Sequence, residues 1–457
     1  MLYNILKPLT NIFYRVNYKL AVKGRERIPA KKPVILSPNH TNGFVDPVTV
    51  AMILPLKVRF FARGDVFKGR LAKWALNDMN ISPMYRIQEG YSELKKNDKT
   101  FEECRTLLAD NKALLLFPEA ICIQEKRLQP LKKGLSRIVF QTEELFDFKK
   151  DVQIIPIGLN YSSPKKFRSR FYVNFGEPIS IKEFEPLYKQ DKVRAINDFT
   201  KLLEAEMAKL IININNKDND DLVEEITEIY LHYWMKEKQY DLTDIEKQYY
   251  ASKEIAGMIN YHDSRNPNLI SSLKAKSTPY RRQLKTLELH DHLLRPENIH
   301  KMNIGRFFMD FIIIWFGMPI YLIGLILNYP PYYIAKNFAD TKIKKVEFYA
   351  SVFVNMSMLL WIAYYGVQLL AVALISRSWP FLALYALLVP CTGFYVLKFY
   401  PVMKKIFGRW RLLRLVRKDR DTLEKVMTER TQLIAEIEFA KKEYLSSLQE
   451  QVLSKAI

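Results

Sequence analysis

The chain has 457 residues, with 70 Lys and Arg against 49 Asp and Glu, and a formal net charge of +21. Such a charge suits phosphate-bearing substrates, anionic membrane surfaces or nucleic acid, but the absence of helix-turn-helix, zinc-finger and RNP motifs argues against nucleic acid. The three cysteines, Cys104, Cys122 and Cys391, are too widely spaced for a framework of disulfides or metal ligands, which favours a reducing cytoplasmic environment.

The N-terminal segment, residues 1–28, mixes apolar and basic positions. Lys7 and Pro8 interrupt its apolar run, so it is neither a spanning helix nor a signal peptide. We expect an amphipathic helix at a membrane interface, with Tyr14 and Tyr18 among its aromatic contacts. A helix packed on the following domain is the alternative.

Residues 29–210 alternate short apolar runs with helical patterns. The runs that read as buried strands cover residues 34–36, 58–61, 113–117, 152–157 and 171–175. Helical stretches between them predict an α/β domain around a largely parallel mixed sheet. In open sheets of this kind ligands gather where strands end.

A histidine and a carboxylate follow the first of these strands, in the run SPNHTNGFVDP over residues 37–47. His40 is suited to take a proton near neutral pH, and Asp46 to hold its tautomer. Six positions on a helix turn through about 240°, so the pair requires a turn that folds back, which Asn42-Gly43 favours. The alternative is that Asp46 is a helix N-cap before Pro47 and that His40 is an ordinary loop histidine.

Four further segments follow in order, over residues 60–68, 81–86, 115–120 and 152–157. Together with Asn-His…Asp-Pro they resemble the sequence blocks of the glycerolipid acyltransferases, over roughly residues 20–210. Five residues separate His40 from Asp46, where the usual spacer has four. The longer spacer resembles the branch that contains fungal glycerol-3-phosphate/dihydroxyacetone-phosphate acyltransferases.

This resemblance implies O-acyl transfer from a thioester donor, acyl-CoA or acyl-ACP, to glycerol 3-phosphate or lysophosphatidate. His40 would be the general base, Asp46 would orient it, and Glu119 would contact the acceptor's hydroxyls or organise its site. No metal or cofactor is expected, because the thioester already carries an activated acyl group. A membrane scaffold on a degenerate acyltransferase fold, or an enzyme for a non-phosphate lyso-lipid, remains an alternative.

The segment 115–120, which resembles the family's third block, departs from the family pattern. Ala120 stands where the family has glycine, which removes easy access to positive φ, and residues 121–123 lack the arginine found in many members. Its anion-binding role must then move or be absent. The candidates for holding the acceptor's phosphate are Arg86, Arg127, Lys132 and Lys133. The alternative for these side chains is a solvated basic loop.

Residues 211–302 are polar, aromatic and helical in pattern, which predicts a helical connector or a cap over the acyl chain. His290-Asp291-His292 suggests metal binding at first sight. Alternate residues on a helix point apart and no further ligand pattern accompanies them, so we expect no metal site.

The membrane region covers residues 303–400, with apolar stretches at 307–327, roughly 352–375 and 380–397. Basic residues follow the first and third stretches, and the positive-inside rule places both clusters in the cytoplasm. The first stretch, with Gly317-Met318-Pro319 at its centre, is then a re-entrant or in-plane hairpin, and the other two span. This predicts a multi-pass membrane protein with a cytoplasmic catalytic domain and C-terminus; three spanning helices are the alternative.

Residues 401–457 form a basic helical tail, whose portion 404–420 we expect against anionic membrane lipids. Apolar residues recur along the tail at heptad spacing: Leu423, Val426, Leu433, Ile437, Ala440 and Tyr444. The spacing predicts a coiled coil or a helix packed on the domain, and Arg430 interrupts it. A dimer through this helix is left open.

Overall fold

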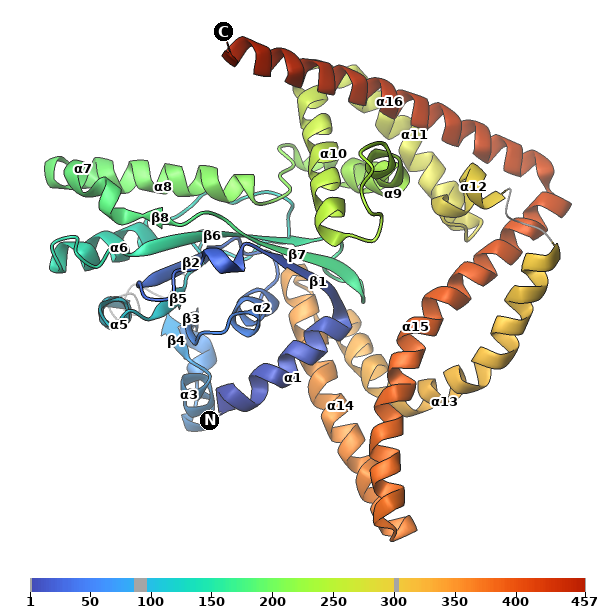
Figure 1. Ribbon diagram of the computed structural model, residues 1–457, viewed down its shortest axis with the longest axis horizontal. Coiled ribbons are helices and arrows are strands. Elements are labelled where there is room, and N and C mark those ends of the chain that lie inside the picture. Colours follow the sequence, from blue (N-terminus) through green and yellow to red (C-terminus); the bar gives the residue numbers. More distant parts are fainter. Residues whose placement is uncertain (1, 86–96, 300–303, 457) are drawn as a thin grey trace. The chain divides into compact units, whose positions relative to one another are not determined.

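A computed structural model of the chain describes residues 2–85, 97–299 and 304–456 (Figure 1). The chain divides into two compact units. Unit 1 contains residues 1–213 and 338–358, and unit 2 contains residues 214–337 and 359–457. Residues 338–358, which the sequence assigned to the membrane region, belong to unit 1.

Unit 1 is built on an eight-stranded sheet in the order β1-β7-β6-β2-β5-β3-β4, with β8 paired to β6. Only β7 and β8 run antiparallel to β6, and the other pairs are parallel. The predicted α/β fold with a largely parallel mixed sheet is therefore confirmed. The strands are β1 (Tyr18–Lys23), β2 (Val34–Pro38), β3 (Val58–Arg63), β4 (Ile81–Met84), β5 (Ala113–Leu115), β6 (Gln153–Tyr161), β7 (Ser169–Phe175) and β8 (Ile179–Ser180).

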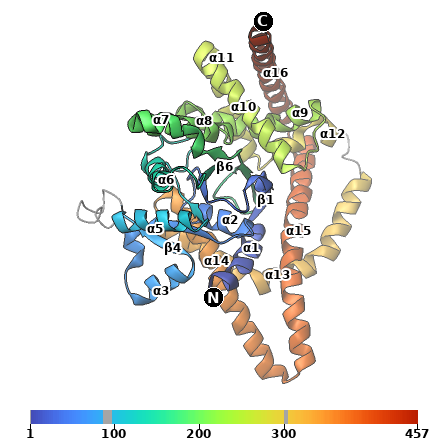
Figure 2. The ribbon, with the colours of Figure 1, turned by 60° about the vertical axis from the view of Figure 1, so that its left-hand side comes forward.

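Helices cover the sheet of unit 1, with α7 and α8 on one side and α1, α2 and α3 on the other (Figures 1 and 2). A buried core joins the sheet to its helices through residues such as Ile35, Phe140 and Phe199. Asp191 caps α8 by accepting the Arg194 N–H at 2.9 Å. The helices are α1 (Leu2–Asn17), α2 (Val45–Ile53), α3 (Arg70–Asp78), α5 (Asn97–Ala109), α6 (Gly134–Leu145), α7 (Glu185–Gln190) and α8 (Lys192–Lys209).

The N-terminal segment is a helix only as far as Asn17, and it continues into the edge strand β1. Tyr14 and Tyr18 are buried, at 1% and 3% exposure, so the expectation that they contact a membrane is wrong. The Tyr18 ring instead packs edge-on against Tyr161 and Phe171. Aromatic side chains that the sequence assigned to a lipid interface thus belong to the domain's own core.

Unit 2 is helical. The sequence had left open whether the C-terminal helix α16 packs on the domain or pairs with a second copy. Val426, Leu433, Ile437 and Ala440 are all buried, and α16 packs along α10 and α11. These positions therefore pack within unit 2. The helices are α9 (Asp220–Glu237), α10 (Ile245–Arg265), α11 (Pro267–Thr286), α12 (Pro296–Ile299), α13 (Ile304–Lys342), α14 (Val346–Ser376), α15 (Trp379–Lys418) and α16 (Arg420–Ala456).

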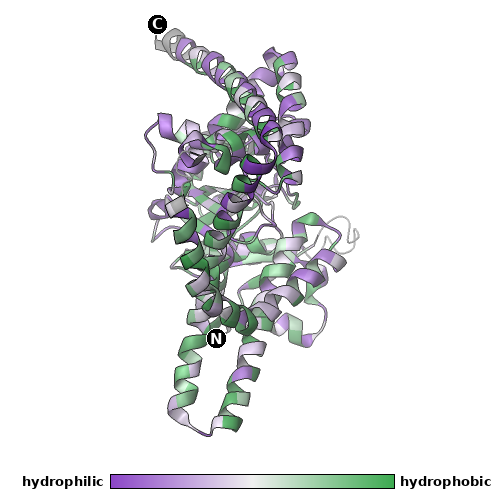
Figure 3. Cartoon of the chain, turned by 90° about the vertical axis from the view of Figure 1, so that its right-hand side faces the viewer, coloured by the Kyte–Doolittle hydropathy of each residue, from purple (hydrophilic) through white to green (hydrophobic). Residues whose placement is uncertain are grey.

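Three helices, α13, α14 and α15, are long and apolar enough to cross a membrane. Figure 3 shows hydrophobic residues along much of the antiparallel pair α14 and α15. Residues 307–327 do not form the expected hairpin, because α13 continues through Pro319, Pro330 and Pro331. Segment 307–327 is thus part of one uninterrupted helix.

Side-chain hydrogen bonds explain how α13 continues through two of these prolines. Proline has no N–H, so Pro330 and Pro331 leave the carbonyls four residues earlier without their helical donors. Tyr364 donates to one of these carbonyls, Ile326 O, at 3.4 Å, and the Gln368 amide donates to the other, Leu327 O, at 3.0 Å. The neighbouring helix therefore replaces both missing donors.

Candidate active site

The loop that carries the histidine begins where β2 ends, and Asn39 fixes its start. The Asn39 side chain donates to Leu159 O at 3.2 Å and accepts the Leu159 N–H at 2.7 Å, on the neighbouring strand β6. Asn39 itself is buried. The side chain of Asn39 therefore attaches the start of the loop to the sheet, immediately before His40.

His40 and Asp46 form a hydrogen-bonded pair. His40 Nδ1 lies 3.0 Å from Asp46 Oδ2, and the same oxygen accepts the N–H groups of Thr41 at 2.8 Å and Asn42 at 2.7 Å. The loop thus folds back as the turn dipeptide predicted. Asp46 is not an N-cap: α2 begins at Val45, so the carboxylate lies inside the first turn and points back at the loop.

The His40 ring has a defined orientation and one unengaged nitrogen. It stacks on Phe117 with ring centroids 4.0 Å apart, and its side chain is 12% exposed. Asp46 accepts from Nδ1, and within the described part of the chain nothing hydrogen-bonds to Nε2. This tautomer leaves the Nε2 lone pair available to accept a proton.

Tyr161, at the end of β6, is a site residue that the sequence interpretation missed. Its hydroxyl donates to Asp46 Oδ1 at 2.7 Å, and Asp46 is completely buried. Burial and the nearby Asp46 charge raise the pKa of the Tyr161 phenol well above its usual value, so it remains a donor. The available signal was its position at the end of the strand that pairs with β2.

Glu119 lies beside His40, as the sequence predicted for the third block. Its Oε1 accepts the His40 backbone N–H at 3.2 Å, and the His40 carbonyl accepts the Ile123 N–H at 3.2 Å. Burial raises the pKa of the Glu119 carboxyl to about 8, so the group is mostly protonated at neutral pH. Glu119 and Ile123 therefore hold the backbone of the loop at His40.

Ala120, which stands where the family has glycine, keeps the backbone conformation that glycine would adopt. Ala120 adopts φ 56°, in the left-handed region, and donates its N–H to Phe117 O at 3.1 Å. The alanine thus takes up the conformation that the missing glycine would adopt more easily. Cys122 Sγ accepts the Gly43 N–H at 3.1 Å, which joins the altered block to the histidine loop.

Of the four phosphate-binding candidates, the structure describes Arg127, Lys132 and Lys133. Arg127 Nε lies 3.0 Å from a carboxylate oxygen of Glu125 in its own loop, and Lys132 and Lys133 are exposed. Arg86 lies outside the described residues.

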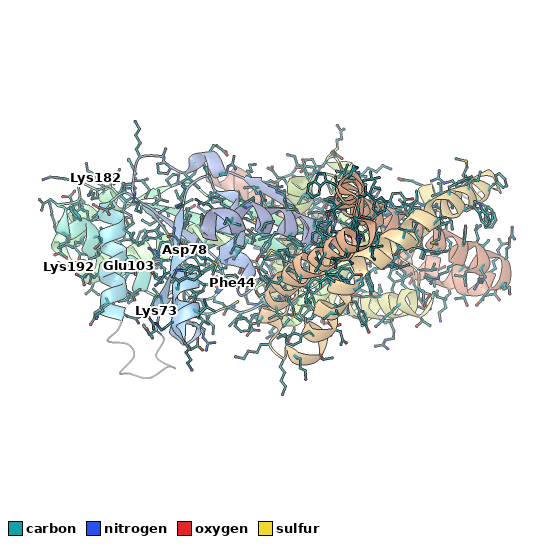
Figure 4. All side chains as sticks on the ribbon, turned by 90° about the horizontal axis from the view of Figure 1, so that it is seen from below. Phe44, Lys73, Asp78, Glu103, Lys182 and Lys192 are labelled. Atoms are coloured by element: carbon teal, nitrogen blue, oxygen red, sulfur yellow. The ribbon has the colours of Figure 1, made fainter. Side chains whose placement is uncertain are left out.

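Two basic side chains elsewhere in unit 1, Lys182 and Lys192, are labelled in Figure 4. Seen from below, Lys182 and Lys192 lie at one end of the unit, away from Phe44 beside the histidine loop (Figure 4). Across the residues with a described placement, no cluster of three or more His, Cys, Asp or Glu is arranged to hold a metal ion.

Comparisons with known proteins place these features in a family. Residues 19–160 match the family model Acyltransferase. Glycerol-3-phosphate O-acyltransferase 1 of Saccharomyces cerevisiae is 25% identical over 51% of this chain and 30% of its own length. Glycerol-3-phosphate O-acyltransferase 2 of the same yeast is 22% identical over 72% of this chain and 44% of its own length.

Two further matches have related titles. An uncharacterized acyltransferase of Schizosaccharomyces pombe is 23% identical over 67% of this chain and 42% of its own length. The crystal structure of the 1-acyl-sn-glycerophosphate (LPA) acyltransferase PlsC from Thermotoga maritima aligns with a TM-score of 0.33 and 14% identity, over 46% of this chain and 79% of that one.

This chain spans less than half the length of each of the three yeast relatives. The family model nevertheless covers the sheet from β1 to β6, and with it His40, Asp46 and Glu119. Residues 19–160 are therefore similar to the Acyltransferase family, and the chain is similar to two glycerol-3-phosphate O-acyltransferases.

Proposed function

We propose that this protein is a membrane-bound O-acyltransferase that moves a fatty acyl chain from a thioester donor to a hydroxyl of glycerol 3-phosphate or lysophosphatidate. The observation that carries the proposal is the pair in which buried Asp46 holds His40 Nδ1 and leaves Nε2 unengaged. The donor is acyl-CoA or acyl-ACP.

The chemistry follows from this geometry. His40 Nε2 removes the proton of the acceptor hydroxyl as its oxygen attacks the thioester carbonyl, and Asp46 stabilises the imidazolium that forms. When the tetrahedral intermediate collapses, the new C–O bond remains, the C–S bond breaks and the imidazolium returns the proton to the leaving thiolate. Loop amides or basic groups stabilise the oxyanion.

Acceptor binding involves the loop between β5 and α6. Glu119 organises this loop around the His40 backbone, and Arg86, Arg127, Lys132 and Lys133 are the candidates for the acceptor's phosphate. Two relatives are named glycerol-3-phosphate O-acyltransferases, which supports a phosphorylated glycerol acceptor. Neutralising Lys133 should raise the acceptor's KM more than the donor's, and unchanged KM values for all four variants would place the phosphate elsewhere.

The decisive experiment uses the full chain in detergent. Wild-type protein is given acyl-CoA or acyl-ACP with a panel of acceptors, and the products are identified by mass. His40→Ala should lower turnover about 10²–10⁴-fold, while His290→Ala, which changes an exposed histidine of unit 2, should leave it unchanged. Near-normal turnover in His40→Ala would refute the mechanism.

The same panel separates the alternatives. Glycerol 3-phosphate, dihydroxyacetone phosphate, lysophosphatidate and non-phosphate lyso-lipids are compared under one set of conditions. Acylation of the non-phosphate lyso-lipids alone would replace the proposed acceptor class. Absence of thioester-dependent acylation would favour the membrane scaffold, which Ala120 and the missing third-block arginine motivate.

For the membrane, we propose a multi-pass arrangement with the sheet and the C-terminus in the cytoplasm and basic residues against anionic lipids. Cysteine labelling tests it. Probes near Lys344 and Lys405 should react from the cytoplasmic side, and a probe near Ser378 from the opposite side. Labelling near Lys344 from outside would instead support three spanning helices.

A further inference from the structure

The first turns of the candidate membrane helix α14 belong to unit 1 and touch the histidine loop directly. A Cβ built on Gly43 would lie 2.7 Å from Ser351 Oγ, 3.0 Å from Glu347 O and 3.1 Å from the Phe348 ring. Gly43 also has φ +31°. The loop and α14 therefore lie too close together for any side chain at position 43, so the backbone of Gly43 packs directly against α14.

Ser351 supplies a capping acceptor that the sequence of α2 lacks. A helix begins with N–H groups that lack intrahelical partners, and a side chain at the N-cap usually accepts one of them. The N-cap of α2 is Phe44, which has no side-chain acceptor. Ser351 Oγ instead accepts the Phe44 N–H at 2.7 Å, and it shares the Val45 N–H, at 3.3 Å, with Asn42 O, which accepts the same group at 3.0 Å.

The same hydroxyl also reaches the other side of the turn. It donates to Asn42 O at 3.4 Å, and Ser351 is only 6% exposed. Asn42 and Val45 flank the turn that brings Asp46 back to His40. One buried hydroxyl therefore contacts both ends of the turn.

A second polar contact one turn along α14 fixes the helix in this place. Asn355 donates to Ser351 O at 2.8 Å within the helix and to the Tyr14 hydroxyl at 3.5 Å on α1. Ala350 and Val354 are both 1% exposed. This part of α14 is thus packed into unit 1, which keeps Ser351 at a defined position against the loop.

We propose that Ser351 is a positioning residue for acyl transfer: from the start of a membrane helix, it caps α2 and fixes the turn that presents Asp46 to His40. The inference rests on the proposed function. It implies that α14 is a part of the active-site framework as well as an anchor, because removing this helix would remove the cap.

The test compares Ser351→Ala with Ser357→Ala in the full chain in detergent. Ser357 lies on the same helix and is also buried, but among the described residues its hydroxyl donates only to Val354 O, at 2.8 Å in that helix. Ser351→Ala should lower kcat about tenfold with little change in either KM, because misplacement of a catalytic group acts on the chemical step. It should also speed hydrogen exchange of the Phe44 amide, whereas the Val45 amide keeps Asn42 O as its acceptor. Ser357→Ala should do neither.

The two measurements separate the possible failures. Normal kcat in Ser351→Ala would overturn the inference, and so would a lower kcat without faster exchange at Phe44. An inactive wild-type protein would overturn the proposed function instead. In that case the exchange measurement still decides whether Ser351 holds the turn.

Discussion

Tyr161→Phe tests whether the buried hydrogen bonds around Asp46 serve the histidine. The carboxylate accepts four hydrogen bonds, from His40, Thr41, Asn42 and Tyr161, and this substitution removes one of them. A hydrogen bond to a charged group contributes about 1.5–3 kcal/mol, so the free energy of unfolding should fall by about that amount. The ring should stay in place, since it stacks on Phe171 at 3.8 Å.

The kinetic effect should be smaller than that of removing the base. Tyr161 donates to Asp46 both before and during proton transfer, so much of its bond energy is common to the ground and transition states. We expect kcat to fall by less than about tenfold, against about 10²–10⁴-fold for His40→Ala. With one donor fewer, the carboxylate stabilises the imidazolium more, so the acid limb of the pH–rate profile should move to higher pH.

Purified variants would be compared by thermal unfolding and by steady-state acylation between pH 5 and pH 9. Tyr188→Phe is the matched control, because the Tyr188 hydroxyl also donates to a carboxylate, Glu144, at 2.9 Å in the same unit. It should leave kcat and the pH profile unchanged. If Tyr161→Phe matched the wild type in stability, kcat and pH profile, the buried tyrosine would have no part in holding Asp46.

Three further predictions concern stability. In the folded protein the pKa of Glu119 is raised from 4.5 to about 8, so between these pH values the folded chain keeps a proton that the unfolded chain releases. The unfolding midpoint of the wild type, relative to that of Glu119→Gln, should therefore fall as pH rises from about 4.5 and level off above about 8. A midpoint difference independent of pH would contradict this. Ala120→Gly should raise the free energy of unfolding by up to about 1 kcal/mol in denaturant titrations, because relief of the positive φ outweighs the entropy of glycine; a loss of stability would show that φ is unstrained there. Gln368→Leu should lower the free energy of unfolding in detergent by about 0.6–2 kcal/mol, and by less in a Pro331→Ala background, where the helix regains its own donor. Equal losses in the two backgrounds would show that Gln368 does not compensate for Pro331.

The sequence predicted the sheet and the histidine turn because both follow from local chemistry. Apolar runs bounded by turn residues define strands, and the dipeptide Asn42-Gly43 between a histidine and an aspartate defines a turn. Tyr161 and Ser351 are different. Each reaches the loop from a distant part of the chain, 115 residues from Asp46 for Tyr161 and 307 residues from Phe44 for Ser351, and nothing in the local pattern marks their partners. The strand β1 was missed for a similar reason, since only its pairing with β7 makes residues 18–23 a strand.

The prediction of a hairpin within residues 307–327 rested on the positive-inside rule, with Gly317-Met318-Pro319 at its centre, whereas α13 is continuous through this stretch and through the two prolines that follow it. Pro330 and Pro331 remove two donors from α13, and a helix alone would break or bend there. Residues of α14 supply the donors, as Tyr365 also does for Ala386 O, the carbonyl that Pro390 leaves free in α15. A neighbouring helix can thus supply the hydrogen-bond donors that a proline removes. The sequence shows the proline but does not show which distant side chain replaces the donor.

The third block bears on whether the fold is that of an enzyme or of a degenerate scaffold. Loss of a family glycine and arginine suggests decay if the rest of the site has relaxed as well. Here Ala120 keeps the left-handed backbone despite its cost, Cys122 Sγ accepts the Gly43 N–H, and Glu119 still accepts the His40 N–H. A relaxed loop would be expected to lose such strained and buried contacts first, since nothing would oppose their loss. Their retention around His40 supports an acyltransferase whose third block has changed in composition while keeping the contacts that hold the base.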